Sequence, residues 1–262
     1  MDKRSLLDRI ARDTEERVLL AHVLDKCELC RTRDVPTHTD FLSPAERRGA
    51  EELLHAALYH DGWRTLGGYA DAERRMLCFL PAWQEEPDSE ELLAVLRVRW
   101  HESETLGHRD LLGSLMALGV VRGKLGDILV SPQSADVIVC ADVADYLARE
   151  WTQAGRVRLR VQRIPPDALN VPERRVRVIR DTVATLRLDA VASTGFGMSR
   201  GRAAELIASG RVQLNHRETT KPDAAVREGD VVSARGLGRF TLAEVGGQSK
   251  KGRTAIAVER YL

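Results

Sequence analysis

Apolar and charged residues recur at helical spacing in the first part of the chain. Between Leu6 and Leu29 the apolar positions follow the helical period and charged residues fill the intervals, which predicts one or two amphipathic helices. Ser43, Pro44 and Glu46 then supply an N-cap, a proline at the first helical position and the acid of a capping box. We therefore expect a further helix from Ser43 to about Tyr59, within a helical N-terminal region.

The middle of the chain alternates between strand and helix patterns. The expected elements are a strand at 94–100, a helix at 108–118, strands at 125–131 and 136–140, a helix at 142–153 and a strand at 156–164. This βαββαβ order is that of the ferredoxin-like split βαβ arrangement, to which RRM-like domains belong. In the last strand, apolar residues alternate with Arg156, Arg158 and Arg160, so one face is expected to be buried and the other cationic.

Shorter elements follow in the C-terminal part. We expect a strand at 174–184, short helices at 188–193 and 200–209, strands at 212–214 and 231–234, and a final hairpin formed by 240–245 and 255–258. Proline and acidic residues mark the boundaries: the run QEEPDSEE at 84–91, which follows a strand expected at 75–80, and the prolines between 165 and 172. The pattern predicts an α+β protein with domains at 1–86, 87–172 and 173–262.

Composition and charge narrow the class of protein. The chain has 262 residues, of which 43% are hydrophobic and 30% charged, as in globular proteins. Its N-terminus shows neither a signal sequence nor a membrane span, and four cysteines are too few for a disulfide framework, so we expect a cytoplasmic protein. Residues 156–262 hold 21 Lys/Arg and 11 Asp/Glu, whereas the first 155 residues have a net charge of −9. The basic C-terminal part predicts a polyanionic partner, with nucleic acid first.

The segment from Arg187 to Arg235 carries the most specific pattern. It resembles the S4 RNA-binding domain, and the matched positions are Arg187-Leu188-Asp189, Ser199-Arg200, Ala203, Leu206-Ile207, Gly210, Val212, Asn215, Lys221-Pro222 and Gly229-Asp230-Val231. Ser199 can cap a helix whose first amide groups, together with Arg200 and Arg202, would offer a site for a phosphate. Asp189 is expected to be an internal partner for a nearby arginine or a helix-start residue, and not an RNA contact.

The resemblance and the charge pattern together define the predicted RNA-binding residues. They are Arg187, Ser199, Arg200, Arg202, Arg211, Asn215, Arg217, Lys221, Lys250, Lys251 and Arg253, with Arg156, Arg158 and Arg160 as secondary candidates. Lys250, Lys251 and Arg253 form either a basic finger or a solubilising turn at a glycine-flanked hairpin tip. Because exposed arginines contribute little to stability, we expect the protein to fold without Arg187 and Arg200, although Arg187 could also pair with an acid.

Motifs outside the S4 segment indicate a narrower family. They are Thr39-Asp40-Phe41-Leu42-Ser43-Pro44, Gly67-Gly68-Tyr69 with Ala72-Glu73-Arg74, His108 to Leu115 with Leu118-Gly119, Gly126-Asp127-Ile128 and Lys250-Lys251-Gly252-Arg253. By these motifs the chain resembles the YlmH family of S4-domain proteins over nearly its whole length. The resemblance implies a helical N-terminal region, an RRM-like centre and a C-terminal S4 domain of the αL type. It also implies ribosome-linked function, since the S4 domain is similar to that of heat-shock 15-type proteins, which bind the large subunit with peptidyl-tRNA during rescue of stalled ribosomes.

Enzyme and cofactor motifs are broken or absent in the sequence. Gly119 to Lys124 has the wrong glycine spacing for a P-loop, and Gly195-Phe196-Gly197 is an incomplete dinucleotide fingerprint. Cys27 and Cys30 have the spacing of a zinc pair, but a second pair is missing, so we expect structural thiols, no metal and no cofactor. His108, Arg109 and Asp110 begin a helix, where we expect capping and packing.

Three functions stay open on the sequence. The first is a non-enzymatic, monomeric protein that binds ribosomal RNA on the large subunit, with tRNA as a further partner and a protein partner for the acidic N-terminal half. The second is an RNA-modifying enzyme with its active site in residues 1–164, and the third is a cell-division adaptor, a role also associated with the family. The central strands carry only Trp100 for base stacking, so we expect the centre to act as a scaffold or to bind through its strand arginines.

Overall fold

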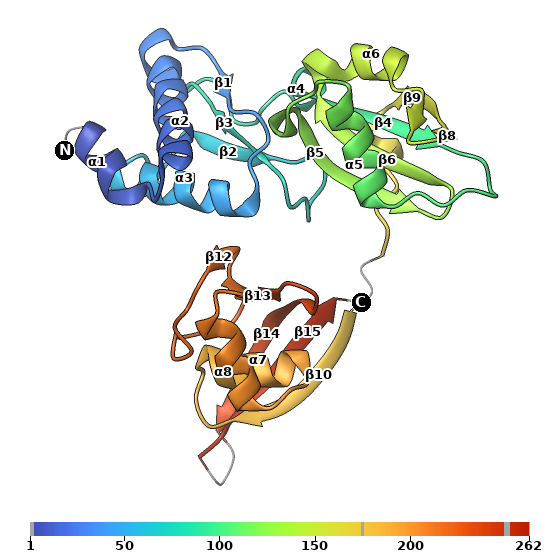
Figure 1. Cartoon of the computed structure of the whole chain (residues 1–262). Coiled ribbons are helices and arrows are strands. Elements are labelled where there is room, and N and C mark those ends of the chain that lie inside the picture. The colour runs from blue at the N-terminus through green and yellow to red at the C-terminus, as the bar shows by residue number, and fades with distance from the viewer. Residues whose placement is uncertain (1–2, 174–175, 249–251, 262) are drawn as a thin grey trace. The chain divides into compact units, whose positions relative to one another are not determined.

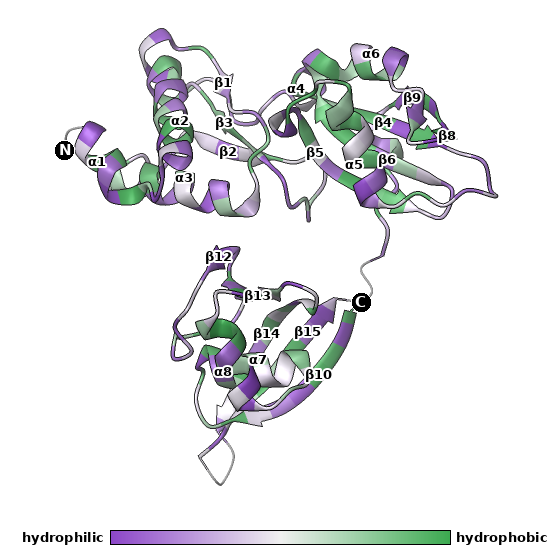
Figure 2. Cartoon of the chain, viewed as in Figure 1, coloured by the Kyte–Doolittle hydropathy of each residue, from purple (hydrophilic) through white to green (hydrophobic). Residues whose placement is uncertain are grey.

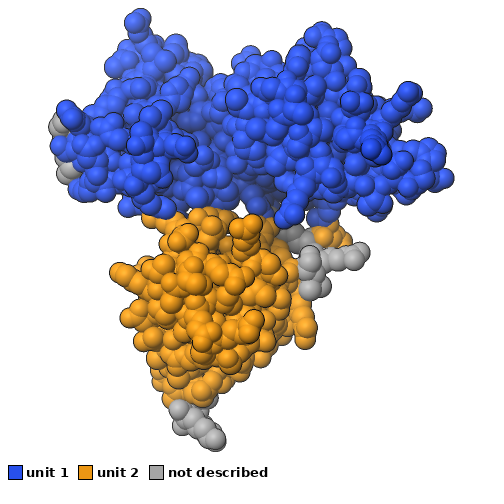
Figure 3. All heavy atoms as spheres, in the orientation of Figure 1, with its two compact units in different colours: residues 1–172 blue, residues 173–262 orange. Residues whose placement is uncertain are grey.

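The computed structural model describes residues 3–173, 176–248 and 252–261 (Figure 1). The chain divides into two compact units, residues 1–172 and residues 173–262 (Figure 3). Both units combine helices with antiparallel sheets, so the α+β class is confirmed.

The N-terminal part of the first unit contains three helices and a small sheet. The helices are α1 (Lys3–Ile10), α2 (Thr14–Arg33) and α3 (Pro44–Ala56), and the Ser43–Glu46 capping box begins the third of them as predicted. The sheet has the order β1-β3-β2, with β1 (Thr37–His38), β2 (Trp63–Leu66) and β3 (Met76–Phe79). Only β3 was expected from the sequence. The other two strands have two and four residues, too short for an alternating pattern to identify.

A four-stranded antiparallel sheet forms the rest of the first unit. Its order is β5-β6-β4-β9. The elements are α4 (Ser89–Leu92), β4 (Leu93–Arg99), α5 (His108–Ala117), a 3-10 helix η1 (Arg122–Lys124), β5 (Leu125–Ser131), β6 (Ser134–Cys140), α6 (Ala141–Glu150), the hairpin of β7 (Gln153–Ala154) and β8 (Val157–Arg158), β9 (Arg160–Ile164) and η2 (Pro166–Ala168). The strand expected at 156–164 is therefore divided between β8 and β9. Val157, Leu159 and Val161 nevertheless face one core, as their alternation predicts.

Both faces of the central sheet are covered. On one face, Leu96 and Val137 pack with Leu111 of α5 and Leu147 of α6. On the other face, Leu93, Ile138 and Cys140 pack against side chains from the N-terminal part, which are Phe41, Met76, Cys78 and Leu80. Residues 1–86 and 87–172, expected as separate domains, therefore share a core within one compact unit.

The second unit is built on a six-stranded antiparallel sheet. Its order is β10-β15-β14-β13-β11-β12, and β10 carries both hydrophobic and hydrophilic residues (Figure 2). The elements are β10 (Val176–Val183), α7 (Leu188–Phe196), α8 (Arg200–Ala208), β11 (Val212–Leu214), β12 (Arg217–Glu218), β13 (Val231–Ala234), β14 (Gly238–Gln248) and β15 (Thr254–Tyr261). Leu188 and Ile207 bury the two helices against Phe240 of the sheet. In the described ranges, no helix is both long and apolar enough to cross a membrane.

Candidate RNA-binding site

Asp189 joins the two helices of the second unit through two arginines. Its carboxylate accepts hydrogen bonds from Arg187 at 3.2 and 3.3 Å and from Arg200 at 3.0 and 3.1 Å. The Asp189 side chain is only 7% exposed, whereas both arginines are about half exposed. The predicted pairing of Asp189 with a nearby arginine is correct, and it extends to a second arginine eleven residues away.

The two guanidinium groups keep Asp189 ionised. Burial by itself raises the pKa of this carboxyl, but the hydrogen bonds from Arg187 and Arg200 outweigh burial, so the pKa lies below its ordinary value. The negative charge in turn holds both guanidinium groups at the ends of α7 and α8. Each arginine still has donors that face solvent, since a guanidinium has five N–H groups and Asp189 uses two from Arg187.

The start of α7 is fixed to the loop that carries Lys221. The backbone N–H of Leu188 donates to the carbonyl of Ala224 at 2.8 Å, and that of Asp189 donates to the carbonyl of Pro222 at 2.9 Å. These bonds satisfy two of the amide groups that a helix leaves open at its N-terminus. They also bring exposed Lys221 to the same end of α7 as Arg187.

Ser199 begins α8 as the sequence predicts. Its hydroxyl accepts a hydrogen bond from the backbone N–H of Arg202 at 3.3 Å, so one of the free amide groups is already used by the cap. The Arg202 side chain is exposed, and no acidic side chain of the described ranges pairs with it. Arg202 is therefore a cation on the helix start that is available to a phosphate.

Arg211 lies directly before the strand that follows α8, and it is exposed. Among the residues that the structure describes, no carboxylate forms an ion pair with Arg211 or with Lys221. Arg235, which the sequence analysis omitted, is a neighbour of Arg211, because its backbone N–H faces the Arg211 carbonyl at 3.4 Å and Val212 pairs with Ala234. Only strand pairing could have identified Arg235, since 24 positions separate the two arginines in the sequence.

Asn215 has partners within the protein. It occupies the left-handed region together with His216 in the turn between β11 and β12. Its amide nitrogen donates to Asp230 at 2.7 Å, and its side-chain oxygen accepts from the backbone N–H of Val231 at 3.0 Å. This arrangement favours a structural role over the RNA contact that we expected for Asn215.

The remaining predicted residues of the second unit differ in their exposure and in their hydrogen-bond partners. Arg217 is half-buried, and Arg253 donates from Nε to the Thr182 hydroxyl at 2.9 Å and from a terminal nitrogen to the Thr182 carbonyl. Arg253 thus ties β15 to the end of β10. Lys250 and Lys251 lie outside the described residues, so the proposed basic finger stays a prediction.

The secondary candidates belong to the first unit. Arg158 and Arg160 are exposed on β8 and β9, and Arg156 is exposed in the turn before them. Arg160 pairs across the sheet with Arg99, which is also exposed. On the sheet face that includes Arg160, the positions of Leu93, Ile138 and Cys140 are covered by the N-terminal part.

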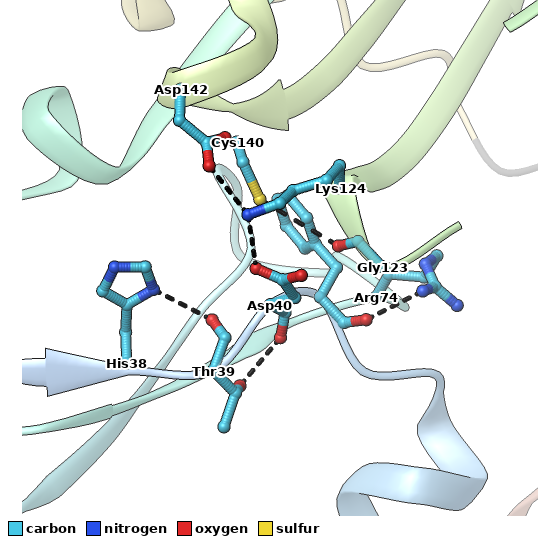
Figure 4. A network of polar contacts seen from close by, with 9 residues as sticks. His38, Thr39, Asp40, Arg74, Gly123, Lys124, Cys140 and Asp142 are labelled. Carbon is cyan, nitrogen blue, oxygen red and sulfur yellow. Dashed lines mark hydrogen bonds and ion pairs between the residues drawn. The ribbon is translucent and has the colours of Figure 1, made fainter. Parts of the chain in front are cut away.

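Several side chains fasten the N-terminal part onto the central sheet. Arg74 donates to the carbonyls of Phe41 and Leu125, both at 2.8 Å, and Asp127 accepts from the Tyr69 hydroxyl at 2.8 Å. Lys124 bridges Asp40 and Asp142 at 2.9 and 2.7 Å (Figure 4). Asp40, Phe41, Tyr69, Arg74 and Asp127 are all motif residues of the family resemblance. Their positions show that these motifs form an internal junction, in which Tyr69 bonds to Asp127, Asp40 to Lys124, and Arg74 to backbone carbonyls.

Comparison with known proteins identifies the family. Residues 186–232 match the S4 domain, and residues 92–168 match a family described as "Putative RNA-binding domain in YlmH". The chain is 34% identical over 247 residues to "Ribosome-associated protein quality control protein P2" of Bacillus subtilis (strain 168), covering 94% of this chain and 95% of that protein. The chain belongs to the YlmH family. It is thus an RNA-binding protein of the S4 class, as the sequence predicts.

A solved structure shares the fold of part of this YlmH-family protein. It is "Cell division protein ylmH from Streptococcus pneumoniae", which is 18% identical with a TM-score of 0.50, covering 61% of this chain and 98% of that one. At this identity the likeness concerns the fold alone.

His108 and Asp110 of the YlmH-family chain serve the start of α5. The Asp110 carboxylate accepts a hydrogen bond from the backbone N–H of Gly107 at 2.8 Å and so caps the start of the helix, although Gly107 has no side chain to complete a capping box. Burial, and then the charge of Arg122, lower the pKa of His108. The capping role predicted for this motif is confirmed for Asp110.

The thiols of Cys27 and Cys30 lie in the core of the helical part. Burial raises the pKa of Cys27 to about 11 and also raises the pKa of Cys30. In the described ranges, no three His, Cys, Asp or Glu side chains are grouped so that they could hold a metal ion. The two thiols behave as small apolar groups, as an unpaired CxxC in a helix predicts.

Proposed function

We propose that this protein docks on structured ribosomal RNA of the large subunit when that subunit carries peptidyl-tRNA, in the quality control of stalled ribosomes. The S4 class supports RNA as the ligand. The printed name of the Bacillus subtilis relative, which aligns over nearly the whole chain, supports the ribosome and quality control. A ribosomal partner also supports a cytoplasmic location.

One observation supports the S4 surface as the main contact. Arg202, Arg211 and Lys221 are exposed cations, and no acidic side chain of the described ranges neutralises them. Elsewhere in this unit, the buried carboxylate of Asp189 orders two further guanidinium groups. Cations that have no internal partner are the ones whose binding to phosphate releases counterions without breaking an ion pair.

We propose an RRM-like, scaffolding role for the central part. The strand order β5-β6-β4-β9 with both helices on one face matches the ferredoxin-like arrangement of the βαββαβ order. The face on which RRM domains stack bases is here packed against Phe41 and Met76. We therefore assign to Arg156, Arg158 and Arg160, at the uncovered end, at most a second contact with RNA.

The proposed function involves no catalysis. Neither matched family is that of a catalytic domain. Asp110, a titratable group within the region of the alternative active site, accepts a hydrogen bond from the backbone N–H of Gly107 at the start of α5. An RNA-modifying activity would need such a group to face a substrate.

The proposal is tested by sedimentation with large ribosomal subunits across a salt series. The variant Arg202→Ala/Arg211→Ala/Lys221→Ala should bind less tightly, and its logarithmic salt slope should be shallower by about 2 to 3 units, since about 0.7 to 0.9 is lost per phosphate contact. Its melting temperature should match that of the wild type, because these side chains are exposed and have no described ion pair.

The matched control removes three exposed cations from the first unit, with Arg9→Ala/Arg33→Ala/Arg109→Ala. It changes the net charge equally and should leave the slope unchanged. If both triple variants lose affinity to the same extent, binding follows overall charge and the S4 surface is not the site. If only subunits with peptidyl-tRNA bind tightly, the quality-control role is supported, and equal binding to empty subunits would contradict it.

A further inference from the structure

A groove lies beside the segment that joins the N-terminal part to the central sheet. It has a volume of about 650 Å³ and runs between β1, the end of β3 and residues 83–92. Pro36, Leu80, Pro87 and Leu92 supply apolar lining. None of the residues that we placed in the RNA site belongs to it.

Trp83 gives this groove an exposed aromatic wall. Its side chain is 63% exposed, and it lines the groove together with Leu80. Aromatic rings of this size are ordinarily buried in the core or in an interface. In this chain Trp151 and Trp100 are buried, whereas Trp83 is not, so its ring is available to a partner.

Acidic side chains line the same groove. The segment 84–91 has five Asp or Glu residues and no Lys or Arg, and Glu85, Asp88 and Glu91 line the groove. Asp88 is used by the N-cap of α4, which leaves the other two for a ligand. Of the acids in this segment, Glu86 is the one with a described ion pair, to Arg64 at 3.7 Å.

We infer that this groove binds an extended, Lys/Arg-rich segment of a partner protein. A guanidinium or ammonium group would stack on the indole of Trp83 while Glu85 and Glu91 pair with neighbouring cations. The apolar lining would cover the aliphatic stems of the same side chains. RNA does not fit a groove whose lining holds no Lys or Arg and three acids, so this surface has a different ligand from the S4 surface.

The inference does not depend on the proposed ribosomal role, and its test uses the full-length protein without RNA. The probe is a fluorescently labelled 12-residue peptide of Arg, Lys and Gly, with a peptide of Glu, Asp and Gly as its charge-reversed counterpart. Binding is followed by fluorescence anisotropy and by the intrinsic tryptophan signal. We expect the basic peptide to bind and the acidic peptide not to bind.

Two variants address the groove, and each has a matched control. Trp83→Ala should weaken peptide binding by about tenfold, whereas Val18→Ala, at another exposed apolar position, should leave it unchanged. Glu85→Gln/Glu91→Gln should weaken it to a similar extent, whereas Glu102→Gln/Glu104→Gln, which removes the same charge from an exposed loop, should not. All four variants should keep the melting temperature and the RNA affinity of the wild type.

Two outcomes would overturn the inference. Equal weakening by both acidic pairs would show a diffuse attraction to the acidic half of the chain. Self-association of the protein that is lost in Trp83→Ala, seen by sedimentation velocity, would show that a second copy of the chain occupies the groove.

Discussion

The guanidinium group of Arg200 lies 3.0 Å from the buried carboxylate of Asp189 and so connects the start of α8 to the start of α7. Arg187 binds the same carboxylate. Two arginines that the S4 pattern marks as RNA contacts are therefore also part of the internal structure. We therefore expect their removal to change folding as well as binding, whereas the sequence alone predicted that the protein would fold without them.

Removing both arginines should destabilise the second unit. Arg187→Ala/Arg200→Ala leaves the Asp189 charge buried without a partner, and we expect a loss of about 2 kcal/mol in the free energy of unfolding. This is below the usual cost for a fully buried pair, because both guanidinium groups are about half exposed. Urea denaturation followed by circular dichroism measures the change.

A third substitution separates charge from packing in that experiment. Asp189→Asn, added to the double variant, removes the unpaired charge and should restore at least half of the lost stability. Arg202→Ala/Arg211→Ala serves as the control, with no expected loss. A double variant as stable as the wild type would show that the Asp189 pairing contributes nothing to the fold.

The same pairing predicts a dependence of stability on pH. The pKa of Asp189 is lower in the folded protein than in the unfolded chain, so its contribution is complete above the ordinary carboxyl pKa of about 4. The contribution is lost as the pH falls below that value through the folded-state pKa. The difference in melting temperature between wild type and Asp189→Asn should therefore shrink on acidification from pH 6 to about pH 3, and a constant difference would contradict the assignment.

Gly195 should not tolerate a side chain. A Cβ atom at this position would lie 2.3 Å from the ring of Phe240, which is itself packed edge-on against Phe196. We expect Gly195→Ala to lower the free energy of unfolding by about 2 kcal/mol, by overpacking. Gly201→Ala, in α8 with nothing within 4 Å, is the matched control and should be neutral or slightly stabilising. Equal melting temperatures for the two variants would refute the close approach of α7 to β14.

The four cysteines should be unreactive in the folded protein. All four are buried, and burial raises the pKa of Cys27 to about 11 and those of Cys78 and Cys140 to about 12. At pH 8 thiolate is thus scarce, so iodoacetamide should label the native protein far more slowly than the urea-unfolded chain. Mass spectrometry after timed labelling measures this. Fast native labelling of Cys27, or zinc that is lost in Cys30→Ser, would contradict the assignment of both as core thiols.

Local patterns account for the parts of the fold that the sequence predicted. The capping box of Ser43 and Glu46 involves residues three apart, and the alternation through Val157, Leu159 and Val161 records which side of a strand is buried. The S4 segment was identified because its helix start at Ser199 and its turns have characteristic residues. Each of these signals depends on neighbours along the chain, which a sequence displays directly.

The sequence could not predict that one face of the central sheet is covered, because this covering depends on packing between segments that lie far apart along the chain. Ile138 and Cys140 meet Phe41 and Met76, and no periodicity in either segment states that they meet. The two short strands of the N-terminal sheet were missed for a related reason. Their pairing with β3 joins residues 10 to 42 positions apart.

The sequence by itself determined the class of this protein: an α+β chain with an S4 segment and a basic C-terminal part. Only the tertiary structure decided what its charged and polar side chains do. Arg187 and Arg200 share Asp189, Asn215 holds Asp230, and Trp83 stays exposed among acids. The physical reason is that the residue type alone does not show whether an arginine is free for a ligand or paired with a carboxylate of the protein. Which of the two an arginine becomes depends on the carboxylates that the fold brings within about 4 Å of it.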